Sequence, residues 1–331
     1  MIRDLPISKA SGRPAVALAV TALLLSGCAT IKDTTGLQSR EDHYIEQLQN
    51  SDKLEDRLTA LELRSGGRLG FAMMDSAGET LASYRSQERF AMCSTFKTIL
   101  AADVLKRAEL GKLPLRRRIS YGQTDLIEGG PVVQGHFDAA TGKGVMTIEE
   151  LAKATVVYGD NAAANLLLTQ IGGPKSVTDF ARSQGDYVTR LDRNEPLVNE
   201  NGLSDPRDSS SPAAMVWLTH RLLVGKRALK YGSRQKLTNW MVESPTGAER
   251  IRAGLPADWK AGSKTGTCAN AYNDVAIAWD SQKRPVVMAI FLDRPTKTGA
   301  DANKIIAEVA ALVSGNGPTS AQNNVPVKPK S

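Results

Sequence analysis

Strand-like segments stand near both ends of this chain, with a long helical region between them. The predicted elements are a hairpin with strands over 68–75 and 79–84, strands over 274–279 and 286–292, and a final helix over 300–314. From about residue 87 to 237 the pattern is mainly helical. This order implies an antiparallel sheet built from both chain ends. We therefore expect an α/β (α+β) fold whose active site lies between the sheet and a helical subdomain.

Ser94-Thr95-Phe96-Lys97 is the first of two short motifs that can act in catalysis. A serine and a lysine at i and i+3 project from one face of a helix, so the amine can reach the hydroxyl. A free hydroxyl is a poor nucleophile and needs such a neighbour. Unpaired backbone N–H groups at a helix start can also help to stabilise an oxyanion. The alternative is a helix N-cap with a surface lysine.

Lys264-Thr265-Gly266 is the second motif, and it stands before an alternating segment at 273–279 that predicts a strand. An edge strand there could bind an extended substrate, with Lys264 and Thr265 on its carboxylate and Gly266 admitting it closely. The alternative is a strand end with a solvated lysine.

A polar loop at 193–199 supplies a third group of residues. Glu195 and Asn199 could together hold a water molecule, and a carboxylate beside a trapped water is a hydrolytic general base. Asp208 could pair with Arg193 and close the loop. By itself the segment is typical of a charged surface loop, so a catalytic role for it depends on the other two motifs.

The order of Ser-x-x-Lys, Gly159-Asp160-Asn161, Glu195-x-x-x-Asn199 and Lys-Thr-Gly resembles the class A serine β-lactamases over roughly residues 46–315. The resemblance implies a five-stranded antiparallel sheet flanked by helices, with an inserted all-helical subdomain at about 87–237, as in penicillin-binding proteins. The sequences at 90–97 and 264–270 are most similar to the disulfide-bearing, carbapenem-hydrolysing branch.

The resemblance also implies a role for each matching residue. Ser94 would be the nucleophile, Lys97 a base or proton relay, and Glu195 with Asn199 the holder of the deacylating water. The backbone N–H groups of Ser94 and Thr267 would form the oxyanion hole. The residues that would bind the substrate are Asn161 at its acylamide side chain, Lys264, Thr265, Gly266 and Thr267 at its carboxylate, and Arg250 in support of that carboxylate. The alternative for Arg250 is an exposed helix arginine.

Two positions depart from the family. Gly159 stands where the family has a serine, whose hydroxyl passes a proton to the lactam nitrogen as the ring opens. A positioned proton donor is worth on the order of 10²–10⁴-fold in rate, although an ordered water held by Lys97 and Lys264 could fill the space. Gly129-Gly130 stand where many relatives carry an aromatic ring, so we expect a wider entrance and leave the substrate profile open.

The first 28 residues predict export. Basic residues precede an apolar run from Ala15 to Leu25, which is too short for a usual spanning helix and fits a signal peptide. Leu25-Ser26-Gly27-Cys28 resembles the bacterial lipobox. We expect a signal peptide over 1–27, a lipid anchor at Cys28 and a position at the Gram-negative outer membrane, on its periplasmic face. An ordinary cleaved signal peptide is the alternative.

Cys93 and Cys268 remain after the leader, each beside a catalytic motif, in a compartment where disulfides persist. The resemblance to the disulfide-bearing branch implies that the two are bridged. Such a bridge would join the nucleophile's helix to the substrate-binding strand. Two free buried thiols are the alternative.

The mature chain is expected to comprise a polar tether over 28–44, one catalytic domain over 45–314 and a disordered tail over 315–331. The full chain has a formal net charge of +7, but its basic residues are dispersed without interleaved aromatics, which argues against nucleic-acid binding. The histidines, His43, His136 and His220, lack ligand spacing, so neither a metal nor a cofactor is expected.

The leading function is hydrolysis of β-lactam antibiotics by a monomeric serine enzyme. A penicillin-binding transpeptidase or carboxypeptidase would share Ser94, Lys97 and Lys264 but would not need Glu195. A third possibility is a protein that binds β-lactams or peptidoglycan fragments, acylates and stalls, and Gly159 supports it.

Overall fold

The computed structural model describes residues 30–316, with side chains from residue 38 onward. Within this range the chain divides into two units, the first ending at Tyr44 and the second beginning at Ile45. Helix α1 (Thr30–Gln49) occupies most of the segment predicted as a tether. Gln38, Arg40 and Glu41 in that segment are good helix formers. No described helix is long and apolar enough to cross a membrane.

The signal peptide, Cys28 and residues 317–331 of the predicted tail lie outside the described residues. The remaining predictions concern the second unit, whose elements run from α2 to α11.

A five-stranded antiparallel sheet is the centre of the second unit, with strand order β2-β1-β10-β9-β8. The strands are β1 (Arg68–Met74), β2 (Thr80–Tyr84), β8 (Lys260–Cys268), β9 (Ala271–Trp279) and β10 (Pro285–Asp293). Strand β1, from the beginning of the domain, pairs with β10, from its end, with Arg68 opposite Asp293. The predicted fold and its origin in both chain ends are confirmed.

The Lys-Thr-Gly motif lies inside the edge strand β8, so its predicted place before the strand is wrong. The alternating segment at 273–279 belongs to β9, the next strand inward, which pairs with β8 along its whole length. The prediction missed β8 because its residues, KAGSKTGTC, include glycines, lysines and small polar side chains in place of β-branched apolar ones. An edge strand tolerates such a composition because its outer backbone groups are not paired within the sheet.

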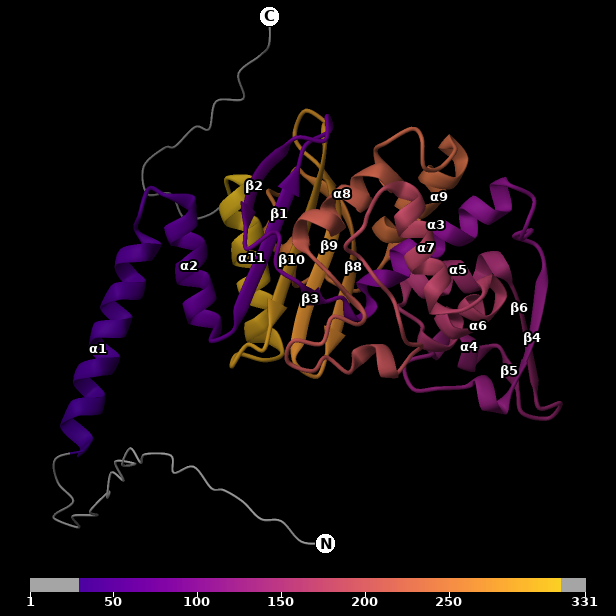
Figure 1. Cartoon of the computed structure of the whole chain (residues 1–331), viewed down its shortest axis with the longest axis horizontal. Coiled ribbons are helices and arrows are strands. Elements are labelled where there is room, and N and C mark those ends of the chain that lie inside the picture. The colour runs from indigo at the N-terminus through magenta and orange to yellow at the C-terminus, as the bar shows by residue number, and fades with distance from the viewer. Residues whose placement is uncertain (1–29, 317–331) are drawn as a thin grey trace, which may run out of the picture. The chain divides into compact units, whose positions relative to one another are not determined.

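Side chains on alternate positions of the sheet pack into two different cores. On β10, Val287, Ala289 and Phe291 join the core shared with the helical subdomain. The intervening Met288, Ile290 and Leu292 pack with α11 (Ala300–Ser314) and α2 (Leu54–Ser65). Because successive strand residues point to opposite faces, a continuous apolar run is required for a sheet covered on both sides. Figure 1 shows α11 on one side of the sheet and the helical subdomain beyond β8.

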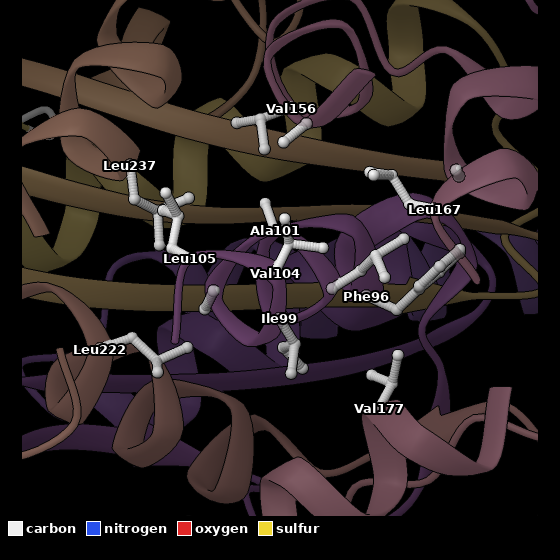
Figure 2. Close-up of a cluster of buried hydrophobic side chains, with 14 of the residues drawn as sticks. Phe96, Ile99, Ala101, Val104, Leu105, Val156, Leu167, Val177, Leu222 and Leu237 are labelled. Atoms are coloured by element: carbon white, nitrogen blue, oxygen red, sulfur yellow. The ribbon is translucent and has the colours of Figure 1, made fainter. Parts of the chain in front are cut away.

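The helical subdomain surrounds α3 (Phe96–Glu109), whose residues from Phe96 to Leu105 are all buried. Figure 2 shows α3 side chains such as Ile99 and Val104 among apolar residues from the neighbouring helices. The surrounding helices are α4 (Pro131–Gly135), α5 (Ile148–Val157), α6 (Asn161–Ile171), α7 (Pro174–Gln184), α8 (Pro212–Leu223) and α9 (Tyr231–Glu243). This packing holds the start of α3 rigidly, close to the sheet.

The region predicted as helical also contains short strands. A three-stranded sheet has the order β4-β6-β5, and β3 pairs with β7. These strands are β3 (Phe90–Ala91), β4 (Arg118–Gly122), β5 (Phe137–Asp138), β6 (Lys143–Thr147) and β7 (Ser209–Ser210). None exceeds five residues, which is too short for a periodic pattern to stand out from the flanking helices. The all-helical description of residues 87–237 is therefore wrong in this detail.

Candidate active site

Ser94 lies in a 3₁₀ turn, η1 (Cys93–Thr95), immediately before α3. Its side chain is half-buried, while that of Lys97, one turn along, is fully buried. The Lys97 amine donates to the Ser94 hydroxyl over 3.0 Å, as the i, i+3 spacing predicts. The alternative of a solvated surface lysine is wrong.

Three connections join the Ser94 turn to the sheet. A disulfide links Cys93 to Cys268 at the end of β8, with the Cα atoms 5.7 Å apart, so the predicted bridge is confirmed. From β9, the Asn273 amide donates to the backbone carbonyl oxygens of Ala91 and Met92. A Cβ on Gly266 would lie 2.6 Å from the Met92 carbonyl oxygen and 3.2 Å from the Ser94 nitrogen. The close approach expected at Gly266 is thus made to the protein's own backbone.

Glu195 reaches the pair from the loop that precedes η3 (Leu197–Asn199). Its Oε1 lies 2.9 Å from Lys97 Nζ, in an ion pair whose two side chains are fully buried, and 3.5 Å from Ser94 Oγ. Its Oε2 accepts a 2.6 Å hydrogen bond from Asn199 Nδ2. The fold therefore brings together residues separated by about a hundred positions in the sequence, and the surface-loop alternative is wrong.

An ion pair between Arg193 and Asp208 closes the loop that carries Glu195. Asp208 accepts from the guanidinium of Arg193 over 2.5 Å and also from the backbone N–H groups of Asp192 and Arg193. The predicted pairing of Arg193 with Asp208 is confirmed. Because Asp208 is buried and thus largely unscreened by solvent, this ion pair fixes the ends of the loop better than a surface pair would.

Asn165 lies outside the motifs and holds the backbone of Glu195. Its side-chain oxygen accepts from Glu195 N over 3.0 Å, and its Nδ2 donates to Glu195 O over 2.9 Å. The signal available in the sequence was its spacing from Asn161, because residues at i and i+4 on α6 share one face. That face looks toward the Lys97–Glu195 pair.

Gly159-Asp160-Asn161 forms the turn into α6. Asn161 Oδ1 accepts from Lys97 Nζ over 2.5 Å, and the carbonyl oxygen of Gly159 accepts from the same amine over 2.8 Å. The buried Asp160 caps α6 by accepting from Ala163 N, and it also holds the start of α4 through Val132 N. The motif therefore places Asn161 beside Lys97 and joins two helices at this point.

Lys264 is buried on β8, near Gly159. Its amine donates to the Thr265 carbonyl over 2.8 Å, and a Cβ on Gly159 would lie 3.3 Å from Nζ. Thr265 is half-buried and Thr267 is exposed, whereas Lys264 on the same strand is buried. The alternative of a solvated lysine at a strand end is wrong.

Arg250 is buried immediately before α10 (Ile251–Gly254), and the exposed-helix alternative is wrong. Its guanidinium donates to the Thr267 hydroxyl over 2.7 Å and to the carbonyl oxygens of Gly266 and Asn273. A cavity of about 310 Å³ lies beside it, with Thr246 and Thr265 in the wall. The arginine therefore orients the Thr267 hydroxyl at the edge of β8.

Two buried lysines dominate the electrostatics. Burial lowers the pKa of Lys97, while the carboxylates of Glu195 and Asp160 oppose that change. Burial lowers the pKa of Lys264 to about 7, and the positive charge of Lys97 acts in the same direction. A charged amine out of contact with water loses hydration, which favours its neutral form. Within residues 30–316, no cluster of three or more His, Cys, Asp or Glu side chains could hold a metal ion.

Comparison with known proteins relates this arrangement to a family. Residues 53–316 match the β-lactamase enzyme family. β-Lactamase OXY-2 of Klebsiella oxytoca is 40% identical over 268 residues, which cover 80% of this chain and 90% of the relative. β-Lactamase Toho-1 of Escherichia coli is also 40% identical, over 265 residues that cover 80% and 89%. The structure of an ancestral Gram-negative class A β-lactamase superposes with a TM-score of 0.76 at 47% identity, covering 80% of this chain and 99% of the other. The chain belongs to the class A β-lactamase family.

A second class A β-lactamase structure, described as putative PenP from Rhodopseudomonas palustris, gives a TM-score of 0.75 at 43% identity, with 80% and 99% of the two chains covered. This chain is accordingly a β-lactam-hydrolysing enzyme of class A.

In this β-lactamase, the glycines at the predicted entrance have a backbone role. Gly129 has φ +77°, and a Cβ there would lie 2.5 Å from Asn161 Nδ2. The Gly129 carbonyl accepts from Asn161 N over 2.8 Å. A side chain at position 129 would strain the backbone at this φ and would force Asn161 to move. Both effects disfavour any residue other than glycine here.

Proposed function

We propose that this β-lactamase acts through an ester on Ser94 that is hydrolysed by a water molecule bound between Glu195 and Asn199. The observation that carries the proposal is the buried Lys97–Glu195 ion pair, whose two members both lie within 3.5 Å of the Ser94 hydroxyl oxygen. A general base must lie within hydrogen-bond reach of the proton that it removes, directly or through one water.

In acylation, the Ser94 proton passes to the Lys97–Glu195 pair. Because the amine and the carboxylate are 2.9 Å apart, the proton taken by one is shared with the other, and the base is the pair. Ser94 Oγ then attacks the lactam carbonyl carbon. Negative charge develops on the carbonyl oxygen, for which we propose the backbone N–H groups of Ser94 and Thr267 as donors.

In deacylation, the water is held by two groups. Glu195 supplies a carboxylate that accepts the water's proton, and Asn199 Nδ2 keeps that carboxylate in place. Asn199 Oδ1 is buried and has no hydrogen-bond partner among the described residues, so it remains available as an acceptor. A buried polar atom of this kind supports a bound water, because leaving it unpaired is costly.

The substrate is proposed to lie along β8. Its carboxylate would meet Lys264, Thr265 and Thr267, with Arg250 holding the Thr267 hydroxyl. Asn161 would bind the acylamide side chain through its Nδ2, which also donates to the Glu128 carbonyl over 3.0 Å. An extended substrate on an edge strand uses backbone groups that the sheet leaves open.

The alternatives find less support. A DD-peptidase has no use for a carboxylate clamped beside the nucleophile, yet Asn165 and Asn199 both hold Glu195 in this structure. A protein that acylates and stalls is favoured by Gly159 alone.

Steady-state hydrolysis of a chromogenic cephalosporin, combined with intact-mass detection of the adduct, tests the proposal. Glu195→Gln is expected to acylate and then accumulate the adduct on Ser94, because the amide cannot accept the water's proton. The matched control is Glu200→Gln in the same loop, whose side chain is 65% exposed. The control should turn over normally. Stoichiometric adduct without turnover in the unchanged enzyme would favour a binder, and no adduct would remove Ser94 as the nucleophile.

Two finer proposals follow from the resemblance. We propose that carbapenems are among the substrates, supported by the bridge beside Ser94, and imipenem hydrolysis by the purified domain tests this. We also propose export to the Gram-negative periplasm, with an outer-membrane lipid anchor at Cys28, supported by the lipobox-like sequence.

A further inference from the structure

The space beside Gly159 is bounded by one cation. A Cβ placed on Gly159 would meet only Lys264 within 4 Å, with Nζ at 3.3 Å and Cε at 4.0 Å. The Lys264 amine is therefore the described group closest to where a side chain at position 159 would begin. Gly159 also adjoins the nucleophile, because Lys97 Nζ donates both to the Gly159 carbonyl oxygen, over 2.8 Å, and to Ser94 Oγ, over 3.0 Å.

The two lysines differ in how their N–H groups are used. An ammonium has three donors. Lys97 Nζ contacts Ser94 Oγ, Gly159 O and Asn161 Oδ1 as hydrogen-bond acceptors, and Glu195 Oε1 as an ion-pair partner, so its donors are all engaged. Within residues 30–316, Lys264 Nζ has one acceptor, the Thr265 carbonyl oxygen. Two of its N–H donors remain for substrate.

The charges around Lys264 come from four elements. Lys97 on α3 and Arg250 before α10 disfavour a positive charge on Lys264, whereas Asp274 on β9 and Glu195 in its loop favour it. Together with burial they bring the pKa of Lys264 to about 7. An acid whose pKa is near the working pH is both protonated and able to release its proton. Arginine, whose pKa is much higher, stays protonated and cannot do the same.

We propose that Lys264 is a catalytic acid in this enzyme, and that its Nζ–H protonates the β-lactam nitrogen as the ring opens. As the carbon–nitrogen bond of the tetrahedral intermediate breaks, the electron pair remains on nitrogen and takes a proton from the ammonium, which becomes a neutral amine. The proton that Ser94 gave to the Lys97–Glu195 pair then restores the ammonium, so acylation consumes no net proton. This inference rests on the proposed Ser94 mechanism. It assigns Lys264 a second task besides binding the carboxylate.

Lys264→Arg separates the two tasks, since it keeps the positive charge but cannot release a proton near neutral pH. Single-turnover acylation is measured in the Gly159 enzyme and in Gly159→Ser, which supplies a hydroxyl. In the Gly159 enzyme, Lys264→Arg should slow acylation by on the order of 10²-fold or more, with KM changed only a few-fold. In the Gly159→Ser background the same change should slow acylation by less than about 10-fold, because the hydroxyl provides another donor.

The pH profile is a second readout. Below pH about 7 the Lys264 ammonium is populated, and above it the proton is lost, so acylation should fall as pH rises through 7. With Lys264→Arg this fall should disappear. Gly159→Ala is the matched control, because it fills the same space at the same φ of +70° without a hydroxyl. Thermal melting checks that each variant is folded, and if Gly159→Ser does not fold, the pH profile decides.

An equal loss in both backgrounds, with an unchanged pH profile, would reduce Lys264 to a carboxylate-binding residue. A large loss in folded Gly159→Ala, with little loss in Lys264→Arg, would instead identify a water beside Gly159 as the donor, and the inference would be wrong. Either result leaves the Ser94 mechanism intact. Failure of the unchanged enzyme to form any Ser94 adduct would remove the mechanism itself.

Discussion

Asn165→Ala tests whether the position of Glu195 is set through its backbone. The Asn165 side chain makes two hydrogen bonds, one to Glu195 N at 3.0 Å and one to Glu195 O at 2.9 Å. Alanine removes both, and Glu195 is buried, so a backbone donor and a backbone acceptor lose their partners together. Each unsatisfied buried group costs about 1–3 kcal/mol, less where water can enter.

We therefore expect Asn165→Ala to lower the free energy of unfolding by about 2–4 kcal/mol. For a domain of this size that corresponds to a melting temperature lower by roughly 5–15 °C. Glu195 Oε1 is 3.5 Å from Ser94 Oγ, already at the limit of a hydrogen bond, and a displacement of about 1 Å can cost 10²-fold in rate. Deacylation should slow by on the order of 10²-fold, and the adduct on Ser94 should become visible.

Thermal unfolding and single-turnover kinetics measure the two effects. Thr169→Ala, one turn further along α6, is the control, because its exposed hydroxyl donates to the Asn165 backbone carbonyl and not to Glu195. That variant should keep its stability to within about 0.5 kcal/mol and its full activity. If Asn165→Ala lost stability but deacylated normally, Glu195 would be positioned by other contacts, and the reasoning would be wrong.

Three further predictions concern the bridge, a buried carboxylate and the leader. Replacing Cys93 and Cys268 by serine opens a loop spanning 175 positions, for which chain entropy gives a stabilisation of at most about 5 kcal/mol. Urea unfolding of this variant should show a free energy of unfolding lower by roughly 2–4 kcal/mol. Mass spectrometry of the unchanged enzyme without reduction should show the linked peptide. Burial raises the pKa of Asp274 from 3.8 to about 6, so its charged form opposes folding above pH 6; this cost begins to fall as the pH drops below 6 and is lost near pH 3.8. The free energy of unfolding should thus rise between pH 8 and 5 relative to Asp274→Asn, and parallel curves would contradict this. Cys28→Ser should release the enzyme from the membrane fraction of expressing cells, whereas an unchanged distribution would exclude the lipid anchor.

Local sequence patterns predicted elements well where periodicity and end signals agree. The helix expected over 300–314 is α11 (Ala300–Ser314), because its apolar residues recur at helical spacing and Gly315 follows in a left-handed conformation. The first hairpin was found because the turn Ser76-Ala77-Gly78 separates two strand-like runs. Strand β8 was missed because its residues serve the active site and close packing more than they favour a strand. Gly266, for example, has no side chain and lets β8 lie against the backbone of Ser94.

The order and chemistry of the motifs were determined by the sequence alone. Ser94 and Lys97 are three residues apart, across the turn that leads into α3, and need no distant partner to meet. Whether Glu195 reached them depended on the fold of a loop a hundred residues away. The burial of Arg250 and Lys264 was likewise decided by tertiary structure. A short motif specifies which atoms are present, but hydrogen-bond distances and pKa values depend on the segments that pack around those atoms. Here the packing buries Lys97 and Lys264 and lowers the pKa of both, so that they can exchange protons.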